Sequence, residues 1–398
     1  MKNKILLIIV IILLCALPFF LYKKEEKIPD YISIEYQENI FPLYEKHYVK
    51  DLIKSANVEI LSKDEILENE TIGKHTYNVK IKDKNKVYTY PIDYEIKDTT
   101  SPIFIRAFSN MTILESDTEP LCNKIVYADD YDNTLSCQVN GEYYLGKIGT
   151  YKNLEFVITD SSSNESKYPF TLQIVKEIEK NNSIYTPKYL YIEDIIKNYK
   201  KENTSIGIDI SRWQGNVDFE EVKKSGIEFV IMRIGTQQSI DDTLDMDSRF
   251  KEYFEKAKKV GLKIGVYVYN TATTKEKGKY CAEWVIDQLQ GEKLDLPVAY
   301  DFEDWNNFME YKTSLYSLSS AYKEFEKTLK SHGYDAMLYS SKYYLEHVWM
   351  IDETSNIWLA HYTDKTNYQG SYMLWQMTSL AKINGITENT VDIDILYK

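Results

Sequence analysis

In the second half of the chain, short apolar runs alternate with longer stretches in which apolar positions recur every three or four residues. The runs predict eight strands, at residues 206–211, 228–234, 263–269, 297–303, 335–340, 357–360, 372–377 and 391–396. The stretches predict helices at 248–260, 274–290 and 314–332. Strands that alternate with helices indicate a mostly parallel sheet, and eight of them a barrel. Because the last connections are too short for full helices, we expect an incomplete (β/α) barrel over residues 205–398.

Two segments in the first half repeat one pattern. Each begins with a Gly turn, at Gly73 and Gly149, and continues as an alternating strand, a polar hairpin and a second strand. Repetition after about 75 residues, with short strands throughout, predicts two small all-β sandwiches, at 28–99 and 100–176. They resemble the immunoglobulin-like modules that stand in tandem on bacterial cell-surface proteins, with residues 99–102 as the hinge. We expect these modules to act as spacers.

The chain starts with an uncharged apolar run between charged flanks. This run, Ile5–Tyr22, is near the lower length limit of a bilayer span. The cleavage site of a signal peptide is missing. Processing as a lipoprotein at Cys15 is disfavoured, because Leu14 is large where a small residue is needed. We therefore predict that residues 1–27 form a single-pass transmembrane anchor, with the rest of the chain outside the cell.

Composition narrows the class of protein. The chain is 43% hydrophobic and 27% charged, as in globular proteins, and its net charge of -13 argues against a nucleic-acid partner. Cys122 and Cys137 lie in the same predicted module, where they could form a disulfide outside the cell or remain two buried thiols. Residues 177–204 are polar and rich in Lys and Asn, which predicts a linker with at most one short helix.

Acidic residues recur in the predicted barrel strands. Asp209 lies in the first strand, Asp301 and Glu303 end the fourth, and Asp392 lies in the last. Side chains two apart on a strand share a face, so Asp301 and Glu303 should both point into the barrel mouth. The first and last strands become neighbours when a barrel closes. Four carboxylates at one mouth cannot all ionise freely, so at least one pKa should be raised, as a general acid requires. Paired carboxyl groups of this kind carry out glycoside hydrolysis.

Aromatic residues near the strand ends support a sugar substrate, although core packing is the alternative for each of them. The candidates for stacking on sugar rings are Tyr267, Tyr269, Tyr339, Trp358, Tyr362 and Trp375. Metal-binding patterns such as H-E-x-x-H and C-x-x-C are absent from the sequence, and its five histidines are scattered. We therefore expect neither a metal nor another cofactor.

Seven motifs between residues 205 and 398 resemble, in order, those of glycoside hydrolase family 25, the lysozymes (muramidases) of bacteria, phages and fungi. They are GIDISRWQG, FVIMRIG, GVYVY, YDFED, WLAHY, WQMT and VDIDI. The resemblance implies an incomplete, TIM-like barrel that cleaves the β-1,4 bond between N-acetylmuramic acid and N-acetylglucosamine. It implies that Glu303 is the proton donor and that Asp301 orients the acetamido group of the substrate as the nucleophile. Asp209 and Asp392 would shape and polarise the same cleft.

The expected partners are peptidoglycan strands and, through the N-terminal run, the membrane, with the barrel on the cell-wall side. Two other functions stay open on the sequence alone. A surface module could bind glycan without cutting it, although decayed enzymes usually lose the acid first. The acidic cluster could instead hold a metal for hydrolysis of another bond, although the mouth lacks a group of His ligands.

Overall fold

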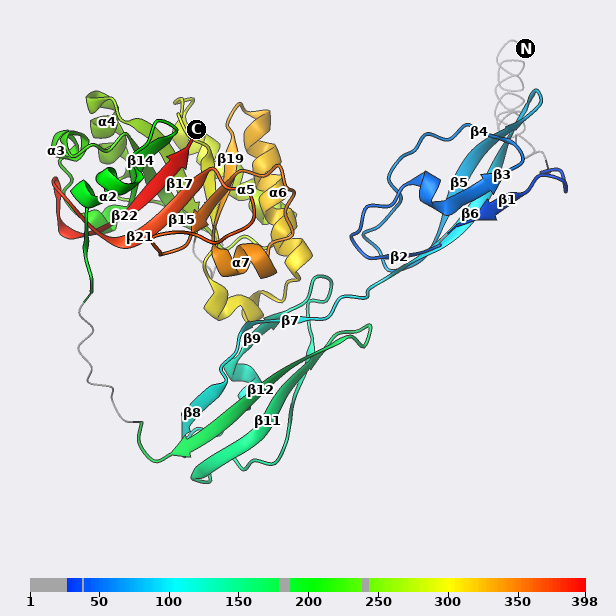
Figure 1. The fold of residues 1–398 in the computed structure, drawn as a ribbon, viewed down its shortest axis with the longest axis horizontal. Helices are drawn as coiled ribbons and strands as arrows, with labels where there is room; N and C mark the ends of the chain where they lie inside the picture. The colour runs from blue at the N-terminus through cyan, green and yellow to red at the C-terminus, as the bar shows by residue number, and fades with distance from the viewer. Residues whose placement is uncertain (1–26, 38, 179–186, 238–242) are drawn as a thin grey trace, which may run out of the picture. The chain divides into compact units, whose positions relative to one another are not determined.

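The computed structural model describes residues 27–37, 39–178, 187–237 and 243–398 (Figure 1). The apolar run Ile5–Tyr22, predicted to be a membrane anchor, lies outside these residues. Within them, no helix is both long enough and apolar enough to cross a membrane. The chain divides between Thr99 and Thr100 into two compact units.

The first unit is built from two small β-sheets and a short 3₁₀ helix, η1 (Val49–Leu52). One sheet has the strand order β2 (Ile40–Pro42), β6 (Lys86–Lys97), β5 (Gly73–Asp83), β4 (Glu59–Ile60), and the other pairs β1 (Ile34–Tyr36) with β3 (Ile53–Ala56). Strands β5 and β6 form an antiparallel hairpin at the place where the repeat predicts one. Their alternating pattern buries Val79, Ile81 and Ile92, because successive side chains of a strand point to opposite faces.

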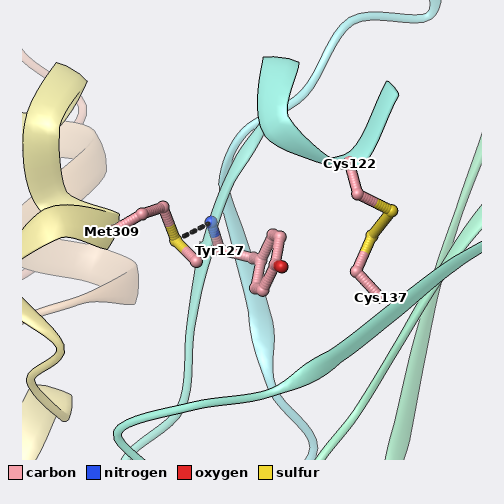
Figure 2. The surroundings of a disulfide bond; sticks show 4 residues. All are labelled: Cys122, Tyr127, Cys137 and Met309. Atoms are coloured by element: carbon pink, nitrogen blue, oxygen red, sulfur yellow. Dashed lines mark hydrogen bonds between the residues drawn. A yellow bond between two sulfur atoms is a disulfide. The ribbon is translucent and has the colours of Figure 1, made fainter. Parts of the chain in front are cut away.

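Residues 100–176, which we call module 2, have a similar arrangement at the start of the second unit. Four strands form one sheet in the order β10 (Ser136–Asn140), β11 (Gly149–Thr159), β12 (Glu165–Val175), β8 (Asn110–Leu114), and β7 (Ile103–Arg106) pairs with β9 (Val126–Ala128). Phe156 of β11 stacks on Phe170 of β12, with ring centroids 4.1 Å apart. The sequence allowed either a disulfide or two thiols, and the structure has the disulfide between Cys122 and Cys137 (Figure 2). It ties η2 (Leu121–Lys124) to strand β10.

Eight strands close into a barrel in the rest of the second unit. In order around the barrel they are β14 (Thr204–Ile210), β15 (Phe229–Gln237), β17 (Lys263–Tyr269), β18 (Val298–Asp301), β19 (Ala336–Ser341), β20 (Ile357–Ala360), β21 (Leu374–Ile383) and β22 (Ile386–Tyr397). The first seven are parallel. Strand β22 runs antiparallel to both β21 and β14 and closes the ring. The prediction of a mostly parallel sheet is therefore accurate except at the last strand.

The direction of β22 follows from the short connection before it. Only a tight turn at Asn384 and Gly385 separates β21 from β22, and Gly385 has a φ of 91°. Two residues can reverse a chain but cannot carry it back to the other end of a sheet, so these strands must be antiparallel. Two short strands extend the sheet, since β13 (Leu190–Tyr191) pairs with β21 and β16 (Leu244–Met246) pairs with β15.

The helices around the barrel begin and end at residues suited to their termini. The three long ones, α4 (Phe250–Val260), α5 (Lys275–Leu289) and α6 (Leu315–Ser331), lie where the periodicity predicts them, and the short ones are α3 (Phe219–Lys224), α7 (Lys342–His347) and the 3₁₀ helices η3 (Arg212–Gln214) and η4 (Trp305–Tyr311). Thr274 and Ser314 accept backbone N–H groups at the starts of α5 and α6. Helix α4 ends at Gly261, which adopts the left-handed conformation.

Part of the segment predicted to be a linker belongs to the barrel. Helix α2 (Ile192–Tyr199) buries Ile192 and Ile195 in the same apolar cluster as the outer faces of the strands. The ring of Tyr199 also meets Trp375 edge-on, with centroids 6.0 Å apart. The linker over 177–204 is therefore shorter than its composition suggests.

Apolar side chains fill the interior of the barrel beneath its mouth. Phe229, Met337 and Trp358 are fully buried there in an apolar cluster separate from the one outside the strands. Gly207 is needed beside them, because a Cβ at this position would lie 2.2 Å from the ring of Phe229. The carboxyl ends of the strands, which carry the polar side chains, lie next to this apolar cluster.

Candidate active site

A pocket of about 240 Å³ opens at the carboxyl ends of the barrel strands. It brings together all four acids predicted from the sequence, Asp209, Asp301, Glu303 and Asp392. This is the end of a parallel barrel at which reactive side chains gather, because the loops that follow the strands also meet there.

The strands place the four acids at different depths. Asp209 of β14 lies opposite Asp392 of β22 in the antiparallel register, which explains why residues so far apart in sequence meet. Asp301 ends β18, and Glu303 follows two residues later. Asp209 and Asp301 are only 7% and 5% exposed, Asp392 is half-buried, and Glu303 is exposed at the mouth.

Burial raises the pKa of every acid in this group. Burial is the largest cause for Asp301, and the negative charges of Glu303 and Asp209 raise its pKa further, while Arg233 opposes them. The pKa of Asp392 is raised by burial and then by the charge of Asp209. Although Glu303 is exposed, the surrounding protein displaces enough water from its carboxyl group to raise its pKa as well. The site therefore favours protonated carboxyl groups, as general acid catalysis requires.

Asp301, which lines the pocket, has an unsatisfied acceptor. Among the described residues, its Oδ1 atom is buried without a hydrogen-bond partner. An acceptor left in this state costs free energy, about 1–3 kcal/mol for a buried group, unless a bound molecule donates to it. An N–H or O–H group of a ligand in the pocket would complete its bonding.

A fifth acid, Asp394, lies beneath the four and was not singled out from the sequence. It is fully buried, its Oδ1 atom accepts a hydrogen bond from Trp358 Nε1 at 2.8 Å, and its carboxyl group lies within hydrogen-bonding reach of that of Asp209. Two carboxyl groups can share a hydrogen bond only when one of them carries a proton. Burial and the charge of Asp392 raise the pKa of Asp394, whereas its contact with Asp209 lowers it and raises the pKa of Asp209. The available signal was its spacing of two from Asp392, which places both on one strand face.

Gln376 fixes the deep side of the pocket through three hydrogen bonds. Its Nε2 atom donates to Asp209 Oδ2 at 2.8 Å. Its Oε1 atom accepts from the hydroxyl groups of Tyr339 and Tyr362, at 2.8 and 3.0 Å. This amide was also missed in the sequence, because alternation along β21 could not be assigned to a face until the partner strands were known.

Arg233 is the one cationic side chain that lines the pocket among the described residues. Its Nε and Nη2 atoms both donate to Asp247 Oδ2, at 2.9 and 2.7 Å, and this anchors the guanidinium group. Because it lowers the pKa of Asp301 against the larger effects of burial and neighbouring acids, it offsets part of the repulsion in the site.

The aromatic candidates divide between the pocket and its surroundings. Four of the six line it, namely Tyr267, Tyr339, Trp358 and Tyr362. Tyr269 is near the acids but is absent from the lining, and the prediction for Trp375 disagrees with the structure. Trp375 lies on the outer face of β21, in the cluster outside the strands, and donates to the carbonyl of His361. The sequence also missed Trp213, which lines the pocket and is 63% exposed, so its ring is open to a ligand.

The Asp209–Asp394 pair makes stability depend on pH. Both pKa values are raised in the folded state, so the pair's contribution is complete at low pH and is lost as the pH rises through the folded-state values. Asp394→Asn imitates the protonated carboxyl group. We expect it to raise the thermal midpoint more at about pH 8 than at about pH 5, by roughly 2–4 °C for each kcal/mol gained.

Calorimetry at both pH values measures this difference. Asp287→Asn, on the exposed face of α5, is the matched control, and its midpoint should shift equally at the two pH values. Equal shifts for Asp394→Asn would show that the pair is not protonated in the fold.

Comparison with known proteins finds a family that part of the chain matches. Residues 208–386 match the sequence model described as glycosyl hydrolases family 25. The autolytic lysozyme of Clostridium acetobutylicum is 30% identical over 190 residues, which are 47% of this chain and 54% of that protein. The chain therefore spans about half the length of this curated relative.

Two solved structures are also similar to the chain. One is the modular autolysin LytC from Streptococcus pneumoniae in complex with a synthetic peptidoglycan ligand, with 20% identity and a TM-score of 0.45, covering 61% of this chain and 56% of that one. The other is a family 25 glycosyl hydrolase from Bacillus anthracis, with 20% identity and a TM-score of 0.43, covering 50% and 92%. By the match of its sequence to the family model, the chain contains a domain of glycosyl hydrolases family 25 at residues 208–386.

Proposed function

We propose that this protein is a lysozyme that cleaves the β-1,4 bond between N-acetylmuramic acid and N-acetylglucosamine in peptidoglycan. The observation that carries the proposal is the pairing of Glu303, exposed at the mouth with a raised pKa, with the buried Asp301, inside a family 25 domain. Such a pair can supply a proton to the leaving oxygen and a second carboxyl group beside the reacting carbon, the two needs of glycoside hydrolysis.

Glu303 acts as the general acid. Its side chain is the most exposed of the four acids, so a glycosidic oxygen can approach it from outside. Its raised pKa keeps the proton available at a pH where an ordinary glutamic acid is ionised. After the bond breaks, the same carboxylate can take a proton from the water that completes the reaction.

Asp301 orients the nucleophile. Its unpaired Oδ1 atom can accept the N–H of the substrate's 2-acetamido group, which turns the acetamido oxygen toward the anomeric carbon. Attack by this oxygen and then by water would retain the configuration of the sugar. Asp209 and Asp392 polarise the deep side of the pocket, where positive charge develops on the sugar ring.

Replacement of the acid gives the direct test. In the full chain, Glu303→Gln should lower the rate of peptidoglycan hydrolysis by roughly 10²- to 10⁴-fold, because glutamine cannot supply the proton. Glu310→Gln, an exposed glutamate of the neighbouring η4, is the matched control and should leave the rate unchanged. Reducing sugars measure the rate, and mass spectrometry of the products should find N-acetylmuramic acid at the reducing end.

Full activity of Glu303→Gln would remove Glu303 from the mechanism. Tight glycan binding without any release by the unmodified chain would instead favour a binding module over an enzyme.

The pH dependence of the reaction tests the raised pKa. The active form of Glu303 is protonated, so kcat/KM should fall as the pH rises through its pKa. Burial raises this pKa, so the fall should lie above the ordinary glutamic acid value of about 4.3. A fall at or below that value, measured on soluble glycan strands, contradicts the assignment.

We also propose that residues 1–27 anchor the enzyme in the membrane, with the modules at 28–99 and 100–176 and the barrel at 205–398 on the cell-wall side. The support is the uncharged run Ile5–Tyr22 and its charged flanks. The full chain should leave the membrane fraction with detergent but not with salt. Release by salt alone would exclude an integral anchor.

A further inference from the structure

Module 2 contacts the barrel at the segment that directly follows Glu303. This segment is η4 (Trp305–Tyr311). The backbone N–H of Tyr127, in β9, donates to Met309 Sδ at 3.5 Å (Figure 2). On the adjacent strand β7, the Arg106 guanidinium donates to Asn306 Oδ1. Both strands of the small β7–β9 sheet therefore bond to η4.

The same edge of module 2 completes the start of helix α6. The N–H groups of Leu315 and Tyr316 donate to the carbonyl oxygens of Asp129 and Asp130, at 2.8 and 3.1 Å. The first N–H groups of a helix have no partner inside the helix and need one from elsewhere. The backbone of module 2 supplies it, so this helix terminus is built to be covered.

Apolar packing joins the two parts as well. Ile105, Val126 and Ala128 are almost fully buried, and they belong to the barrel's apolar cluster together with Trp305 and Phe308. They are absent from the cluster that forms the core of module 2 itself. A domain that served only as a spacer would not need three buried side chains directed at its neighbour.

The contacts continue from η4 to the acid. The N–H of Trp305 donates to the carbonyl of Glu303 at 2.8 Å. The Trp305 ring packs on Phe302, with centroids 4.9 Å apart, and stacks on Tyr344 at 4.0 Å. Phe302, directly before the acid, and Trp305, two residues after it, thus pack on each other, and Trp305 begins the same η4 segment to which module 2 bonds.

A further hydrogen bond reaches the other wall of the mouth. The Tyr343 hydroxyl, in α7, donates to the Phe104 carbonyl at 2.8 Å. Tyr343 lines a groove that adjoins the pocket and shares Glu303, Tyr339 and Tyr362 with it. Module 2 therefore holds both segments that flank the exposed side of the acid.

From these contacts we infer that module 2 is a positioning part of the catalytic unit: it holds η4 and α7 so that Glu303 keeps its place and its desolvated surroundings at the mouth. This inference rests on the proposed hydrolysis, in which Glu303 is the acid. It replaces the expectation that module 2 is a spacer. Arg106, Ile105 and Tyr343 act through η4 and α7 and not on the substrate.

Substitution of a residue in the interface, in the full chain, tests this. Ile105→Asp places a charge in the buried interface without touching the core of module 2. We expect kcat to fall roughly 10- to 100-fold, as for a slightly misplaced catalytic group, with little change in KM. The alkaline fall in the rate should also move to lower pH, because a released Glu303 is better hydrated. Ile148→Asp, on the exposed surface of module 2, is the matched control and should change neither quantity.

Hydrogen exchange separates this inference from the proposed function. In the unmodified chain the amides of residues 305–316 should be protected, and Ile105→Asp should speed their exchange while the Cys122–Cys137 bond stays intact. Unchanged exchange would show that module 2 does not hold this segment. Faster exchange with unchanged kcat would show that the contact does not position the acid. An unmodified chain that protects these amides but releases no sugar would overturn the proposed function instead.

Milder variants cover the case in which Ile105→Asp does not fold. Arg106→Ala and Tyr343→Phe each remove one hydrogen bond across the interface and should lower kcat several-fold. Tyr280→Phe, an exposed tyrosine of α5, is their control. Equal kcat in all three would overturn the inference.

Discussion

The structure depends on one electrostatic constraint, namely that five carboxyl groups converge at one end of a barrel whose interior is otherwise apolar. Coulomb repulsion in such surroundings is too strong for all of them to be ionised. Raised pKa values keep carboxyl groups protonated, which reduces this repulsion, and Asp209 and Asp394 lie close enough to share a proton. The Gln376 amide donates a hydrogen bond to Asp209, and the positive charge of Arg233 offsets part of the negative charge around Asp301. The burial that makes this cluster costly for the fold also keeps a proton on Glu303.

The same constraint explains why the site needs support from outside the barrel. Glu303 is the member of the group closest to water, and it lies beyond the end of its strand, where backbone pairing no longer fixes it. Its position is set instead by the aromatic packing of η4, whose far side is closed by module 2. The most reactive group is therefore held by contacts between domains.

Much of this site could be predicted from the sequence, because strand alternation and the order of strands around a barrel are local rules. They placed Asp209, Asp301 and Asp392 correctly at the pocket. Trp375 was misplaced, since a strand in an apolar run shows no face until its neighbours are known. The docking of module 2 left no local signal, because Ile105 and Val126 look in the sequence like ordinary core residues of their own module.

The antiparallel last strand has a consequence for biosynthesis. Strand β22 pairs with both β14 and β21, and it contributes Asp392 and Asp394. The ring of strands therefore cannot close until the ribosome has passed residue 397, and loop closure over such a sequence separation is slow. A partly made chain has an open sheet and an incomplete set of acids. The pocket with its full set of acids thus forms only after translation of the whole barrel.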